Sequence, residues 1–295
     1  MDRLCAGLVG ALILSGCAVE IPGTDVGGGD SDPGAGGSGS SSDPAEGKLS
    51  SNGLALDTSA LALFDPAPLG HWASETEAIA DSGSLDALLS HPAGAEHIEY
   101  LALCALDEGQ TLTAGGVSYQ GTYGLATQWV DSACDESCQR WVSACVLAHA
   151  NGYGVSVMIS LRGEHPGLVW NDDIAQQYTV QEAAFYGNVF QVDGASAPVE
   201  PLYACIGRAL IAWDDDPSRE DSSLDYLQKR ICGTGGECGL YSTGPCTAPI
   251  ETESICSHDA GWDGYYGDCA AEIVPDPTNP QVFPEVITTY LVDEG

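Results

Sequence analysis

Cysteine content limits the possible folds of this chain more than any other feature. Of its 12 cysteines, two lie in the first twenty residues and ten lie between residues 104 and 269. Ten thiols can all pair if the chain folds outside the reducing cytosol, and each bridge would add about 2–4 kcal/mol of stability. Spacing does not decide which cysteines are joined. We therefore expect five disulfides of unassigned connectivity among Cys104, Cys134, Cys138, Cys145, Cys205, Cys232, Cys238, Cys246, Cys256 and Cys269.

The amino-terminal residues predict export and lipid attachment. Arg3 precedes an apolar run from Leu4 to Leu14, which is too short to span a bilayer. The run closes in Leu14-Ser15-Gly16-Cys17, which resembles the lipobox of bacterial lipoproteins. The resemblance implies a signal peptide over residues 1–16 and a lipid on Cys17.

Lipidation of Cys17 would hold the mature chain on a membrane of the bacterial cell envelope, at the outer membrane or cell surface. Such a terminus carries several acyl chains, which makes anchoring stable. The number of cysteines agrees with lipidation. Cys5 is removed with the signal peptide, and an unmodified Cys17 would leave an odd number of thiols, one of them without a partner. A plain secretory signal, cleaved near Gly16 or Ala18, is the alternative.

Residues 17–50 are predicted to be a Gly/Ser-rich tether. From Gly23 onward they contain almost no large apolar side chains, so they cannot bury enough surface to offset chain entropy. A flexible coil of roughly 27 residues has an end-to-end distance of about 25–30 Å. The tether would lift a folded body clear of the lipid headgroups.

The charge balance is strongly acidic. Eight Lys and Arg face 43 Asp and Glu, which gives a formal charge of −35. This argues against nucleic acid as a partner, since phosphate contacts need basic side chains. It also disfavours anionic membrane surfaces. Divalent-cation binding, adaptation to a salty medium and simple solubility remain as explanations.

The pattern of the remaining residues predicts an α+β fold, with an antiparallel sheet packed against one or two helices. We expect a globular domain over residues 51–231 and a disulfide-stapled, loop-rich subregion over 232–295 that returns a strand to the sheet. The expected helices cover residues 84–89, 133–150 and 222–232. Ser132 is the expected N-cap of the second, and the third has an apolar stripe of Leu224, Leu227 and Ile231 and ends at Gly233. The expected strands cover 99–106, the hairpin 110–123 with its turn at Gly115-Gly116, 155–161 and 286–292. In the strand at 155–161 every second residue is apolar, which predicts one buried and one exposed face.

One face of the helix at 133–150 carries a Cys/His stripe. At 100° per residue, Cys134, Cys138, Trp141, Cys145 and His149 all fall within one sector. Cysteine and histidine four apart suit zinc. However, the first and last of these residues would lie about 22 Å apart along the axis, so one ion cannot bind both. We favour disulfides over a metal site or a redox pair.

The best catalytic candidate is the loop that follows the strand at 155–161. It gathers Arg162, Glu164 and His165, and histidine is a common general base. No nucleophile motif accompanies it. The alternative is a polar turn in which the arginine pairs with the glutamate.

Two acidic clusters are weak candidates for a calcium site. Asp214, Asp215 and Asp216 are adjacent, but lack the alternating spacing of an EF-hand loop. In the second cluster, His258, Asp259, Asp263 and Asp268 are interleaved with Trp262, Tyr265 and Tyr266. Aromatic faces beside carboxylates also suit glycans, while packing on disulfides is the simpler explanation for the aromatics.

Several segments together resemble a set of uncharacterised cysteine-rich lipoproteins of myxobacterial type. They are Glu99–Leu106, Gln139–Cys145, Ile159–Gly163 and Ala183–Gly187. The resemblance covers about residues 99–292 and implies an envelope location, and it carries no catalytic residues to transfer.

The sequence therefore predicts an envelope lipoprotein with a binding or structural role. The alternatives are a calcium- or glycan-binding surface module and an extracytoplasmic hydrolase that uses His165 or His258. The partner is the membrane, through Cys17, together with a protein, glycan or cation ligand. Calcium is the one cofactor considered, and enzymatic activity is left open.

Overall fold

The computed structural model describes residues 48–72, 78–190, 201–211, 222–233, 238–247, 255–258, 264–273 and 276–293. All of these residues belong to one compact unit. The predicted signal peptide, Cys17 and residues 17–47 of the tether lie outside the described residues. In the described part of the chain, no helix is both long and apolar enough to cross a membrane.

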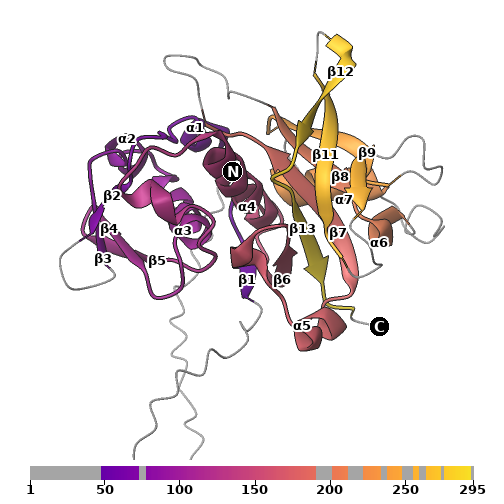
Figure 1. Cartoon of the computed structure of the whole chain (residues 1–295), viewed down its shortest axis with the longest axis horizontal. Coiled ribbons are helices and arrows are strands. Elements are labelled where there is room, and N and C mark those ends of the chain that lie inside the picture. Colours follow the sequence, from indigo (N-terminus) through magenta and orange to yellow (C-terminus); the bar gives the residue numbers. More distant parts are fainter. Residues whose placement is uncertain are drawn as a thin grey trace, which may run out of the picture. The chain divides into compact units, whose positions relative to one another are not determined.

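A six-stranded sheet organises the fold (Figure 1). Its order is β1-β6-β13-β7-β8-β9, and every neighbouring pair is antiparallel except β8 and β9. The strands are β1 (Leu49–Asn52), β6 (Val157–Arg162), β13 (Ile287–Leu291), β7 (Val180–Gly187), β8 (Leu202–Ile206) and β9 (Leu240–Pro245). The first and the last strand of the fold therefore both pair with β6. Strand β1 begins at Leu49, inside the range 17–50 that the sequence predicts to be tether.

Two smaller sheets complete the strand content. The four-stranded sheet contains β2 (Gly70–Trp72), β3 (Ala78–Asp81), β4 (Thr111–Ala114) and β5 (Val117–Gln120). The three-stranded sheet contains β10 (Cys256–His258), β11 (Tyr266–Ile273) and β12 (Asp276–Phe283). The hairpin predicted at 110–123 is confirmed as β4–β5. Gly115 and Gly116 form its turn with φ of 58° and 80°, which glycine adopts without steric cost.

The helix α4 (Glu136–His149) lies between α3 (Gly94–Ala105) and the six-stranded sheet (Figure 1). Every side chain from Trp141 to His149 is buried, as expected of a helix covered on all sides. The other helices are α1 (Thr58–Leu61), α2 (Asp86–Leu89), α5 (Asp172–Gln177), α6 (Arg208–Ile211), α7 (Ser223–Cys232) and the 3-10 turns η1 (Thr127–Val130) and η2 (Pro166–Leu168).

The prediction of a strand at residues 99–106 is wrong, because this segment is the second half of α3. Its buried positions include His97, Ile98, Leu101, Ala102 and Ala105, a spacing of three and four that is helical rather than alternating. Apart from Ile98, the helix has no β-branched residue, so local preference also favours helix. A short apolar run alone does not separate the two structures.

The helix at 133–150 is confirmed, but its predicted N-cap is wrong. Asp135 is the cap, and its carboxylate accepts the backbone N–H of Cys138 at 2.9 Å. Ser132 instead donates to the carbonyl of Gln128.

In α7 the apolar stripe is narrower than predicted, since Leu227 and Ile231 are buried while Leu224 is 43% exposed.

Strand β6 does not alternate between buried and exposed residues as predicted. Its first two residues are exposed and its last four are buried on both faces. Among the described residues, Ile174, Tyr178 and Tyr290 form a cluster with Trp170. The Arg162 guanidinium lies against the rings of Trp170 and Tyr290. The second face of the strand is therefore covered as well.

All ten predicted cysteines are paired, which confirms the five disulfides. The bridges are Cys104–Cys145, Cys134–Cys138, Cys205–Cys246, Cys232–Cys238 and Cys256–Cys269. The last two lie in the cysteine-rich C-terminal region, together with one partner of the third. That region has more strand than predicted, because β9 joins the six-stranded sheet while β10–β12 form their own.

A buried ion pair ties α7 to the six-stranded sheet. The Arg230 guanidinium donates to both carboxylate oxygens of Glu182 at 3.1 Å, and the two side chains are 2% and 1% exposed. Arg230 also donates to the carbonyls of Ala148 and Ala150 at the end of α4. Thr289 donates to the same carboxylate. This arginine thus satisfies carbonyls that a helix terminus leaves open.

Candidate binding site

The loop from Gly163 to Trp170 connects β6 to α5 and forms the candidate site. His165 is the N-cap of η2, and its Nδ1 accepts the backbone N–H of Gly167 at 3.0 Å. Pro166 occupies the first position of that turn, where its missing N–H has no consequence. Gly167 is required by space, because a Cβ there would lie 1.9 Å from the carbonyl oxygen of Tyr123. The loop is therefore fixed by its own sequence.

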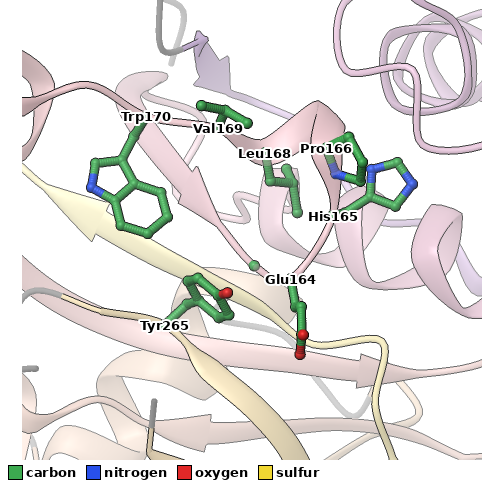
Figure 2. A pocket seen from close by; sticks show the side chains of 8 residues that line it. Glu164, His165, Pro166, Leu168, Val169, Trp170 and Tyr265 are labelled. Carbon is green, nitrogen blue, oxygen red and sulfur yellow. The ribbon is translucent and has the colours of Figure 1, made fainter. Parts of the chain in front are cut away.

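This loop borders a solvent-open hollow of about 480 Å³, which we call the Trp170 hollow. Trp170, Tyr265, Glu164 and Leu168 lie around it (Figure 2). The complete lining is Gly163, Glu164, His165, Pro166, Leu168, Val169, Trp170 and Tyr265. Tyr265 comes from the segment just before β11, about 100 residues along the chain, so the site depends on the C-terminal region.

Two aromatic rings form one corner of the Trp170 hollow. Trp170 and Tyr265 lie with ring centroids 5.6 Å apart and an interplanar angle of 85°, an edge-to-face geometry that aromatic pairs prefer. Both side chains are partly exposed and Glu164 is exposed. The corner thus offers apolar ring surface and a carboxylate to a ligand.

Arg162 supports this corner from within the fold. It is 1% exposed, and its guanidinium lies 5.4 Å from the Trp170 ring centroid and 3.6 Å from that of Tyr290. Its Nη2 donates to the carbonyl of Tyr178 at 2.7 Å. The Tyr290 hydroxyl donates to the carbonyl of Gly264, next to Tyr265. A guanidinium between aromatic rings is a stabilising cation–π arrangement, and Arg162 is a positioning residue here.

His165 points away from Trp170 and Tyr265 (Figure 2). Its ring meets Trp141 of α4 edge to face at 5.1 Å, and it separates the Trp170 hollow from a second one of about 480 Å³. Burial lowers the pKa of His165. Because Nδ1 already accepts a hydrogen bond, the neutral ring carries its proton on Nε2. It can donate there, but a general base needs a free lone pair. The geometry therefore disfavours His165 as the base of a hydrolase.

The Cys/His stripe of α4 is a structural element. His149 Nδ1 and Cys145 Sγ lie 3.8 Å apart, but that sulfur is bonded to Cys104 and offers no thiolate to a metal. His149 Nδ1 donates to the carbonyl of Cys145, and Nε2 accepts from Ser50 of β1. Full burial lowers the pKa of His149 to about 4. The histidine is a neutral link between α4 and β1.

Of the other candidate residues, few are described. Asp214, Asp215, Asp216, Asp259 and Asp263 lie outside the described residues, so the calcium sites stay a prediction. His258 pairs with Tyr266 through the β10–β11 ladder, and only its backbone is described. The N–H of Asp268 donates to Ser257. Tyr266 is fully buried beside the disulfides, which leaves Tyr265 as the described aromatic of that cluster that lines the hollow.

Sequence reasoning missed Trp170 and Leu168. Trp170 lies four residues after Pro166, in the loop that was already identified as a candidate. This position is the one sequence signal that could have indicated it. Its approach to Tyr265 depends on how β11 and β13 pack, which no local pattern reveals. Comparison of the chain with protein-family models, curated proteins and solved structures finds no match.

Proposed function

We propose that this chain is a lipid-anchored protein of a bacterial envelope that binds a carbohydrate in the Trp170 hollow. The observation that carries the proposal is the aromatic corner of Trp170 and Tyr265 beside the Glu164 carboxylate. Sugar rings present apolar C–H faces to aromatic surfaces and hydroxyl groups to carboxylates. Ligand sites in general combine apolar walls with a few fixed polar groups.

Binding rather than hydrolysis is the better fit to this geometry. The described lining has one carboxylate, Glu164, whereas glycoside hydrolysis ordinarily uses two that flank the bond to be broken. His165 is turned away and bonded through Nδ1. The hydrolase alternative would need turnover that is lost in the His165→Ala or the His258→Ala variant, and a substrate screen on the purified protein tests it.

A glycan array followed by calorimetry tests carbohydrate binding. We expect at least tenfold weaker binding in the Trp170→Ala variant and unchanged binding in Tyr241→Ala, which removes an aromatic that is 61% exposed on β9. Equal affinities of wild type and Trp170→Ala would refute the site. Failure to bind any glycan would refute the ligand class.

Mass spectrometry of the mature amino terminus tests the location. A diacylated or triacylated Cys17 is expected after expression in a bacterium that processes lipoproteins. An unmodified terminal residue would exclude the lipid anchor while leaving carbohydrate binding open.

A further inference from the structure

A second hollow lies next to the Trp170 hollow, on the other side of His165. It has a volume of about 480 Å³, and we call it the Gln128 hollow. Four polar side chains line it, those of Thr127, Gln128, Asp135 and Ser137, and the last three are exposed. The Gln128 hollow therefore presents hydroxyl, amide and carboxylate groups, whereas the Trp170 hollow presents aromatic rings.

Local contacts fix the walls of the Gln128 hollow. Gln128 lies in η1, and its carbonyl accepts the hydroxyl of Ser132. Asp135 begins α4 and accepts the N–H of Cys138 at 2.9 Å, and the Cys134–Cys138 bridge closes the same turn. A site whose groups are held in place before binding loses less entropy when a ligand enters.

The two hollows share a boundary. His165 and Pro166 line both of them. Gly163 lines the Trp170 hollow, and a Cβ at this glycine would lie 3.4 Å from the ring of Trp141, which lines the Gln128 hollow. A chain of linked sugar rings can therefore run from one hollow into the other across His165 and Pro166.

The charges around both hollows disfavour an acidic sugar. Glu164 lines one hollow and Asp135 the other, and both side chains are exposed. The described lining of the two hollows contains no Lys or Arg. Lys48 acts on His165 electrostatically, but it is paired with Asp107 at 3.3 Å. The formal charge of −35 adds to the repulsion of an anion.

We infer that the two hollows form one extended site for an oligosaccharide that carries no acidic group. One sugar ring lies on the aromatic corner of Trp170 and Tyr265, and a second ring of the same chain lies among the polar groups of the Gln128 hollow. The inference rests on the proposed carbohydrate binding at Trp170. Linked rings occupy both hollows in one event, so a longer sugar binds more tightly than a single ring.

A length series of sugars tests this inference. The probes are the β-1,4-linked tetramers of glucose, galactose, mannose, xylose and N-acetylglucosamine, the matching monomers, and tetragalacturonate as an acidic tetramer. Each is titrated into the full chain at low ionic strength and followed by nuclear magnetic resonance. We expect the best neutral tetramer to bind at least tenfold more tightly than its monomer and than tetragalacturonate.

Variants of the Gln128 hollow separate its contribution from that of Trp170. Gln128→Ala/Ser137→Ala should remove most of the advantage of the tetramer and leave the affinity for the monomer unchanged. The matched control is Gln228→Ala/Ser242→Ala, which replaces the same two residue types at exposed positions of α7 and β9 and should bind like wild type.

The outcomes distinguish the extended site from the proposed function. A tetramer that binds no more tightly than its monomer, or equally well to Gln128→Ala/Ser137→Ala, would contradict the extended site and leave binding at Trp170 intact. Tighter binding of tetragalacturonate than of every neutral tetramer would refute the ligand class. If no probe binds, or if Trp170→Ala binds all of them like wild type, the proposed function and the inference both fail.

Discussion

The two main hydrophobic clusters of this fold are built from different residues. The larger one surrounds α3 and α4 and is rich in Leu, Ile, Val and Ala. The smaller one lies between the six-stranded and three-stranded sheets, and four of its eleven buried residues are bridged cysteines, Cys205, Cys246, Cys256 and Cys269. Four more are aromatic, and none is Leu or Ile. A core with little aliphatic surface depends on cross-links, as in small secreted domains.

Two disulfides of equal span allow the clusters to be compared directly. Cys205–Cys246 in the smaller cluster and Cys104–Cys145 in the larger one both join residues 41 apart. Chain entropy alone predicts that removal of either disulfide lowers the free energy of unfolding by about 4 kcal/mol. We expect the Cys205→Ala/Cys246→Ala variant to lose more than this, and its β10–β12 sheet to lose hydrogen-exchange protection first. The Cys104→Ala/Cys145→Ala variant should lose about 4 kcal/mol with protection reduced evenly. A greater loss in the second variant would contradict the comparison.

The ion pair between Glu182 and Arg230 lies where the two clusters meet. Ala183 belongs to the larger cluster and Ala184 to the smaller one, directly after Glu182 in β7. Arg230→Met leaves a buried carboxylate without its partner, so unfolding in urea should show a loss of about 3–5 kcal/mol. Adding Glu182→Leu should recover more than half of it. A double variant as unstable as the single one would mean that the pair itself supplies the stability.

His149 makes the larger cluster sensitive to acid. Its pKa is about 4 in the folded protein and near 6.5 in the unfolded chain, so the unfolded state binds more protons between these values. Stability from this group is therefore full above pH 6.5 and falls by about 3 kcal/mol as pH drops to 4. Unfolding free energies from pH 4 to 7 measure the slope, and His149→Gln should lack this contribution. An equal slope in that variant would assign the acid sensitivity to other groups.

The N-cap of α4 gives the smallest effect. Asp135→Ala should cost about 1 kcal/mol, because the N–H of Cys138 loses its acceptor. Ser132→Ala should cost less than about 0.5 kcal/mol, since the hydroxyl of Ser132 lies outside the helix. Thermal unfolding of the two variants decides between the cap seen in the structure and the one that the sequence suggested.

Sequence reasoning succeeded where a local rule was sufficient. Cysteine parity predicted complete pairing, Gly115-Gly116 predicted a hairpin turn, and Ser222 with Gly233 bounded α7. It failed at residues 99–106, where a buried run fits either a helix or a strand. It also failed at Ser160 and Arg162, which are both buried. Tyr290, about 130 positions away, is the register partner of Ser160 in β13 and lies against the Arg162 guanidinium.

The candidate site was only partly accessible to prediction. The loop at Arg162–Pro166 and Tyr265 were each identified, but as parts of two separate sites. Their meeting depends on β13 entering the sheet between β6 and β7, and that pairing is a long-range event with no local signature. The orientation of His165 is likewise set by the backbone of Gly167 rather than by residue type.

The central claim is that a carbohydrate binds at the aromatic corner of the Trp170 hollow. Nuclear magnetic resonance titration with the best glycan from the array tests it most directly, with the indole N–H signals assigned by single substitutions. We predict shifts of the Trp170 indole and Tyr265 ring signals, with no shift at Trp129, whose indole donates to the carbonyl of Ala67 in the core. Saturating glycan that leaves Trp170 unshifted would contradict the account.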